Sequence, residues 1–162
     1  MTGSALFLGF LVLQRLSELV IARRNTAQLM ARGAREVGAE HYPVMVAMHA
    51  SWLVLLVVFG LGQPVSLPWL AAFAVLQAFR LWILGTLGGR WTTRVIVLDE
   101  PLVARGPFRW MRHPNYALVC AEIVVAPMVL GLWWIALLYT ALNAAMLRVR
   151  IRAEEGALAP MR

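Results

Sequence analysis

The segment 105–116 holds the densest group of residues that could do chemistry, reading Arg-Gly-Pro-Phe-Arg-Trp-Met-Arg-His-Pro-Asn-Tyr. A Gly-Pro step favours a turn at Gly106, and Pro114 favours a helix start because proline fits the first helical position. His113 and Tyr116 are three residues apart and would share one face of that helix. The free amides of its first turn could hold a carboxylate or a phosphate. An arginine-rich loop near lipid headgroups would explain the arginines equally well, but it explains His113 and Tyr116 less well.

A second polar group, Arg-Ile-Arg-Ala-Glu-Glu, occupies residues 150–155. Arg150 and Glu154 are four residues apart, which lets their side chains meet along a helix. On an exposed helix such a pair contributes only about 0.3–0.5 kcal/mol. If the apolar residues between the two groups form a helical hairpin, Arg150 and Glu154 lie beside His113 and Tyr116. That neighbourhood would be polar, basic and open to lipid.

Ionisable residues inside apolar segments are costly to bury and require either a partner or a function. Arg15 and Glu18 are expected to pair, and Arg80 is expected to extend toward the polar boundary. His49 is expected to be a hydrogen-bonded packing residue. Glu122 has no basic residue three or four positions away. It needs a cation from another helix, protonation or a polar cavity, and it is therefore a candidate catalytic residue.

The composition indicates a membrane protein. Of 162 residues, 61% are hydrophobic and 14% charged, with a mean hydropathy of +0.72. A disordered chain is excluded, and a water-soluble globular domain is not expected. The net charge of +7 would point to nucleic acid in a soluble protein, but here the basic residues, all arginine, serve as topology signals. We expect no nucleic-acid partner. The single cysteine, Cys120, offers no disulfide and no thiolate cluster, and we expect no metal.

Apolar runs of about 18 residues or more can span a hydrocarbon core roughly 30 Å thick. Three such runs are residues 4–22, 44–61 and 68–87. A fourth run, residues 115–147, would make one helix about 50 Å long, so we expect it to break between Pro127 and Trp134 into two short arms. A single proline-kinked helix is the alternative.

Arginines follow the first and third runs and the end of the fourth, whereas residues 60–67 carry no charge. The positive-inside rule therefore places the amino terminus outside and the carboxyl terminus in the cytoplasm. This arrangement requires about five transmembrane helices, the last two forming a hairpin. We expect one all-α integral membrane domain over residues 1–162.

The two motifs, separated by an apolar hairpin, resemble those of the isoprenylcysteine carboxyl methyltransferase family of integral membrane enzymes. The resemblance covers roughly residues 85–155. The Arg-Arg-Asn-Thr sequence after the first run, and His41-Tyr42-Pro43, are similar to a short bacterial branch of that family. The chain departs from the eukaryotic pattern in carrying Glu122 and in ending soon after its glutamate pair.

The resemblance implies methyl transfer from S-adenosylmethionine, with residues 88–155 forming the cofactor-binding and catalytic part. It implies that His113, Pro114 and Tyr116 contact the cofactor, together with Gly106 and Glu155, and that Arg150 and Glu154 support activity. We hypothesise that Arg150 holds the acceptor oxygen and that Glu154 orients Arg150. The resemblance further implies a bacterial inner membrane, with the active site facing the cytoplasm.

The implied acceptor is a lipophilic or lipidated molecule reached from membrane lipid. A carboxylate is already ionised at neutral pH, whereas a phenol with a pKa near 10 needs a base, for which Glu122 and His113 are the candidates. Prenylated, alkyl-phenol and alkyl-pyrone acceptors all fit this chemistry. Two other functions stay open at this point: a non-catalytic membrane scaffold or transporter subunit, and a phospholipid amine methyltransferase.

Overall fold

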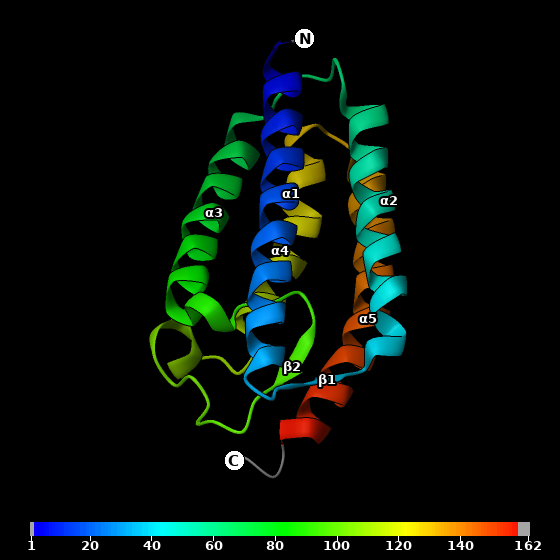
Figure 1. Ribbon diagram of the computed structural model, residues 1–162. Coiled ribbons are helices and arrows are strands. Elements are labelled where there is room, and N and C mark those ends of the chain that lie inside the picture. The colour runs from blue at the N-terminus through cyan, green and yellow to red at the C-terminus, as the bar shows by residue number, and fades with distance from the viewer. Residues whose placement is uncertain (1, 159–162) are drawn as a thin grey trace.

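The computed structural model describes residues 2–158, and its main feature is a bundle of five helices that run alternately along one axis (Figure 1). The helices are α1 (Thr2–Ala31), α2 (Tyr42–Gly60), α3 (Leu67–Leu87), α4 (Pro114–Val129) and α5 (Trp133–Leu158). The start of α1 and the end of α5 lie at opposite ends of the bundle.

The predicted break in the fourth apolar run is confirmed. α4 ends at Val129 and α5 begins at Trp133. Between them, the carbonyl of Pro127 accepts the backbone amides of Leu130 and Leu132, each at 3.0 Å. Gly131 has a φ of 69°, a conformation that glycine adopts without steric cost, and this reverses the chain. The expectation of two short arms is wrong for α5, because its helix continues through the arginine-rich residues and reaches 26 residues.

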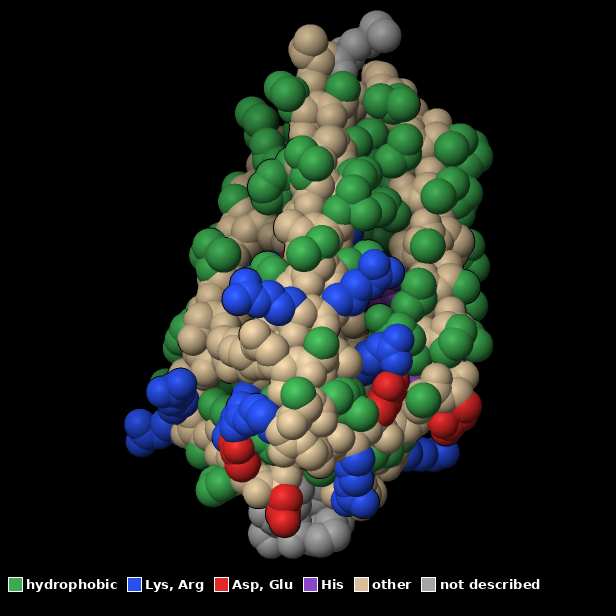
Figure 2. All heavy atoms as spheres, in the orientation of Figure 1, with side chains coloured by type: hydrophobic (Ala, Val, Ile, Leu, Met, Phe, Trp, Pro, Cys, Tyr) green, Lys and Arg blue, Asp and Glu red, His purple; other side chains and the backbone are tan. Residues whose placement is uncertain are grey.

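The helices have the length and composition of a membrane protein. α1, α2, α3 and α5 are each long and apolar enough to cross a bilayer. α4 is apolar but has 16 residues, so it spans only about 24 Å. Figure 2 shows hydrophobic side chains over the upper part of the visible face and charged side chains gathered on the lower half. The protein is therefore an integral membrane protein built on α-helices.

A small sheet departs from the expected all-α fold. β1 (Arg35–Val37) follows α1 and pairs antiparallel with β2 (Val95–Val97), which follows α3, with Glu36 opposite Ile96. Both segments lie at the lower end of the bundle in Figure 1. Val95 and Val97 are buried, as the alternation of a strand requires. Short 3-10 turns accompany the strands: η1 (Ala39–His41), η2 (Gly88–Arg90) and η3 (Gly106–Arg109).

The apolar core fills the other half of the bundle. Phe7 of α1 packs edge-on against Phe73 of α3, with ring centroids 5.1 Å apart. Leu56 of α2 and Ile135 of α5 are fully buried in the same cluster. Near this core, Nδ1 of His49 lies 2.9 Å from the carbonyl of Met45, as predicted for a hydrogen-bonded packing residue.

Six polar side chains meet halfway along the bundle, between α1, α3 and α4. They are Gln14, Arg15, Glu18, Gln77, Arg80 and Glu122. The predicted Arg15–Glu18 pair is confirmed at 2.9 Å. Arg15 also reaches Glu122 at 2.6 Å, and Nε of Arg80 donates to Glu122 at 3.0 Å. Glu122 was expected to need a cation from another helix, protonation or a polar cavity. The structure shows the first of these, with cations from two other helices.

The expectation that Arg80 extends to the polar boundary is wrong. Its side chain is only 4% exposed, because its guanidinium turns inward to Glu122 and also pairs with Glu18 at 2.9 Å. Two arginines and two glutamates thus neutralise one another within the apolar bundle. Each charge depends on partners from at least one other helix, so the cluster ties α1, α3 and α4 together.

Replacing Arg80 with Met is therefore expected to destabilise the bundle. The change leaves Glu18 and Glu122 with Arg15 alone, and breaking a buried pair on one side costs about 3–5 kcal/mol. Denaturant unfolding in detergent micelles, followed by circular dichroism, measures the loss. The exposed Arg24→Gln is the control and should change stability by about 0.5 kcal/mol or less.

Adding Glu122→Gln to Arg80→Met should recover part of that stability, because an unpaired carboxylate is removed. Equal stability of Arg80→Met and Arg24→Gln would show that the cluster does not hold the helices together.

Candidate active site

A cavity of about 390 Å³ lies at the end of the bundle that carries β1 and β2. Its walls come from β2, the loop of residues 98–104, the start of α4 and the polar end of α5. This volume lies within the usual range for small-molecule sites. Four of the predicted site residues line it: His113, Tyr116, Arg150 and Glu154.

The start of α4 and the end of α5 contact each other directly in this cavity. The hydroxyl of Tyr116 donates to Oε2 of Glu154 at 2.5 Å. Nδ1 of His113 lies 3.6 Å from the same carboxylate, and the His113 and Tyr116 rings stack with centroids 5.3 Å apart. The hairpin thus brings the two motifs together, although Tyr116 and Glu154 are 38 residues apart in the sequence.

Arg150 is held from two sides and is only 6% exposed. Its Nη2 donates to the carbonyl of Thr93 at 3.0 Å, and its Nη1 contacts the sulfur of Met45. The guanidinium carbon lies 5.6 Å from the centre of the Tyr116 ring. Within the described residues Arg150 makes no ion pair with Glu154, because Arg150 turns toward Thr93 while Glu154 bonds to Tyr116.

The other predicted cofactor residues surround the cavity rather than line it. Gly106 has a φ of 57°, and a Cβ on it would come within 2.6 Å of Oγ1 of Thr86, so it packs η3 against α3. Pro114 is buried at the first position of α4, as predicted. Glu155 lies 3.6 Å from Nε2 of His113 on the outer side of the site.

Glu122 lies apart from these residues. It is absent from the lining of the cavity, and its two oxygens accept hydrogen bonds from Arg15, Gln77 and Arg80. The structure therefore separates the predicted catalytic residues into two groups. Arg150 and Glu154 belong to the cavity, and Glu122 belongs to the buried charge cluster.

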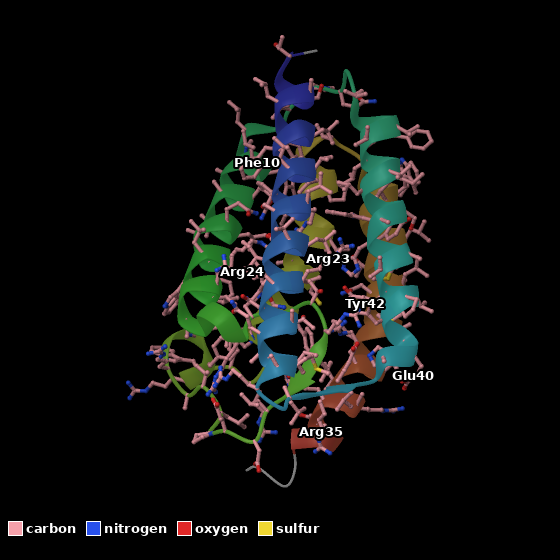
Figure 3. The ribbon with its side chains drawn as sticks, viewed as in Figure 1. Phe10, Arg23, Arg24, Arg35, Glu40 and Tyr42 are labelled. Atoms are coloured by element: carbon pink, nitrogen blue, oxygen red, sulfur yellow. The ribbon has the colours of Figure 1, made fainter. Side chains whose placement is uncertain are left out.

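Tyr42, the first residue of α2, supports the site from outside the predicted residues 88–155. Tyr42 bonds through its hydroxyl to Oγ1 of Thr93 at 3.0 Å, and the carbonyl of Thr93 holds Arg150. In Figure 3, Tyr42 extends from the start of α2 toward the interior, whereas Glu40 points away. The only signal in the sequence was the His41-Tyr42-Pro43 resemblance, which carried no role.

Arg94 contacts both Tyr42 and Glu36. Its Nη1 donates to both oxygens of Glu36 at 2.8 Å, and its guanidinium lies 4.3 Å from the centre of the Tyr42 ring. Hydrogen bonding to Glu36 raises the pKa of the Arg94 guanidinium. This ion pair secures β1 to the cavity wall across the small sheet.

Comparisons with known proteins find a matching family and similar bacterial proteins. Residues 69–160 match the sequence family described as "Isoprenylcysteine carboxyl methyltransferase (ICMT) family". The uncharacterized protein YpbQ of Bacillus subtilis is 38% identical over 159 residues, covering 94% of this chain and 95% of its own. An uncharacterized protein of Haemophilus influenzae is 25% identical over 151 residues, covering 89% and 88%.

No solved structure matches this chain. The matched range includes nearly all of α3, both polar motifs and the hairpin between them, so it contains most of the cavity. The chain belongs to the isoprenylcysteine carboxyl methyltransferase family, whose members are integral membrane methyltransferases that use S-adenosylmethionine.

Proposed function

We propose that this protein methylates an oxygen atom of a lipophilic acceptor, at the cavity formed by α4, α5 and β2. The observation that carries this proposal is the hydrogen bond between Tyr116 and Glu154, because it joins the two family-like motifs at one small-molecule cavity. S-adenosylmethionine, when bound, supplies an electrophilic methyl group at this site.

Two unsatisfied nitrogen atoms support the fit of a charged cofactor and acceptor. Nε2 of His113 and Nε of Arg150 are buried and lack a hydrogen-bond partner within the described residues. Buried polar atoms are normally satisfied, so each is available to a bound oxygen. We assign His113, with Tyr116 and Glu154, to the cofactor and Arg150 to the acceptor oxygen. Glu154 also supplies a negative charge next to a cofactor that carries positive charge.

The charge of the cavity favours an anionic acceptor. Three of the arginines that line it lie against carboxylates: Arg90 against Glu100, Arg94 against Glu36 and Arg112 against Glu155. Arg150 lines it without an ion pair within the described residues. A carboxylate, or the ionised hydroxyl of an alkyl-phenol or alkyl-pyrone, is complementary to this guanidinium, whereas an amine acceptor is not. The role of the chain is to orient the acceptor oxygen and exclude water, because a displacement of this kind depends mainly on near-attack geometry.

The orientation that we propose puts the cavity on the cytoplasmic side of a bacterial inner membrane. The arginines gather at the same end of the bundle as the cavity, as the positive-inside rule requires of a cytoplasmic end. Five crossings require α4, with 16 residues, to span a locally thinned bilayer. A soluble cofactor then arrives from the cytoplasm, and the acceptor arrives from the lipid around the helices.

Binding of S-adenosylmethionine is expected to depend on the α4 residues. Tyr116→Phe removes the hydroxyl that orders Glu154, and His113→Ala removes a direct contact, so each should weaken binding about tenfold or more. Titration calorimetry on the purified chain measures the change, with the exposed Glu40→Gln as control. If the wild type does not bind S-adenosylmethionine in several lipids and detergents, the alternative function as a non-catalytic membrane scaffold would be favoured instead.

Arg150 is expected to act on turnover more than on cofactor binding. Arg150→Ala should lower kcat about a hundredfold with a panel of long-chain carboxylic and phenolic acceptors, because a fixed donor to the reacting oxygen is lost. Arg150→Lys should recover only part of this activity, since an ammonium lacks the rigid planar fork with which the guanidinium can donate to Thr93 and to the acceptor in fixed directions. Unchanged turnover of Arg150→Ala at saturating acceptor would contradict the assignment.

The predicted base role of Glu122 stays a prediction, and Glu122→Gln tests it. If Glu122 is a base, the variant loses turnover of phenolic acceptors at neutral pH while carboxylate acceptors keep theirs. If Glu122 serves only the charge cluster, the variant loses stability, and turnover of both acceptor classes changes in parallel. Rates at several pH values, measured beside denaturant unfolding, separate the two outcomes.

A further inference from the structure

A second cavity, of about 360 Å³, lies beside the end of α3. Arg90 and Arg105 provide its charge, and Leu87, Leu102 and Val103 provide apolar wall. It adjoins the cofactor cavity, since Leu87, Arg90 and residues 102–104 line both, whereas Thr86, Pro101 and Arg105 line this cavity and not the other. An open cavity that combines two guanidinium groups with aliphatic side chains is suited to an amphiphile with a negative head.

The positive charge of this cavity is only partly balanced by the protein. Arg90 and Arg32 both contact the carboxylate of Glu100, so one negative charge serves two arginines. Among residues 2–158, Arg105 makes a single long hydrogen bond, from its Nη2 to the carbonyl of Thr86 at 3.4 Å. An exposed guanidinium with so weak a contact is free to bind an anion.

An apolar stripe leads away from the cavity along α3. Val75, Phe79 and Trp82 are spaced four and three residues apart and lie on one helix face, and the same face ends at Thr86, which Arg105 contacts. Val75 and Trp82 are exposed. Trp110, just after η3, is 82% exposed, which is typical of aromatic residues at a membrane interface.

We propose that this cavity binds the headgroup of an anionic phospholipid. The lipid phosphate lies between Arg105 and Arg90, and one acyl chain follows the stripe of Trp82, Phe79 and Val75 along α3. Free phosphate would use the arginines alone, whereas the apolar wall and the stripe are complementary to an acyl chain. The site does not depend on methyl transfer, and it can be tested without an acceptor.

Native mass spectrometry of the full chain tests the proposal. The detergent-purified protein is titrated with phosphatidylglycerol or with phosphatidylcholine of the same acyl chains. We expect tighter retention of phosphatidylglycerol and about fivefold weaker retention in Arg105→Gln, since one interfacial arginine contributes about 1 kcal/mol. Arg105→Lys should keep most of the affinity, because it keeps the charge. Arg35→Gln removes an exposed arginine of β1 at the same end of the bundle (Figure 3), but outside the lining of this cavity, and should have no effect.

Three outcomes would overturn the proposal: equal retention of the two lipids, an equal loss in Arg35→Gln and Arg105→Gln, or displacement of phosphatidylglycerol by inorganic phosphate. In the last part of the experiment, retention of phosphatidylglycerol is measured with S-adenosylmethionine added at a saturating concentration. Phosphatidylglycerol should stay bound with the cofactor present, whereas its release would assign this cavity to the cofactor site. Trp82→Ala, which shortens the apolar stripe but keeps both arginines, should weaken both lipids to a similar extent.

Discussion

The carboxylate of Glu122 places the strongest constraint on this structure, because a charge inside an apolar bundle must be neutralised by the protein itself. The helices meet that requirement through Arg80 of α3 and Arg15 of α1. Once these contacts form, α4 is fixed against both helices in position and in rotation. Since Tyr116 lies on the same helix as Glu122, and His113 directly precedes that helix, the cluster also determines the position of the cavity wall.

The second constraint is the short hairpin between α4 and α5. Gly131 and the carbonyl of Pro127 turn the chain within three residues, which aligns the two helices antiparallel over their length. The turn lies at one end of the hairpin, and its effect on the site is seen at the other end. Tyr116 and Glu154 come within hydrogen-bond distance only because the turn sets the register between α4 and α5.

Much of the fold could be predicted because its determinants are local. Runs of apolar residues define the helices, and Pro127 with Gly131 marks the break between α4 and α5. The meeting of His113 and Tyr116 with Glu154 followed from the same hairpin. What failed depended on partners far away in the chain: the inward turn of Arg80 requires Glu18 and Glu122 of two other helices.

The strands and the support of Arg150 could not be predicted for a related reason. Three-residue strands have no recognisable alternation, and β1 forms only because β2 lies opposite it. Nothing near Tyr42 in the sequence indicates that its partner is Thr93, which lies 51 residues away. The pairing of Arg150 with the Thr93 carbonyl, in place of Glu154, arises from the same tertiary packing.

The contacts of Arg150 also bear on how the protein is made. β1, Tyr42 and Thr93 are synthesised well before α5, and they enclose a position that only Arg150 of α5 fills. During synthesis the first four helices can therefore insert and assemble around the buried charge cluster while the cavity still lacks one wall. The α5 side of the cavity forms only when the last helix docks, so an intermediate stalled before α5 would hold the buried charge cluster but lack Arg150 and Glu154 in its cavity wall.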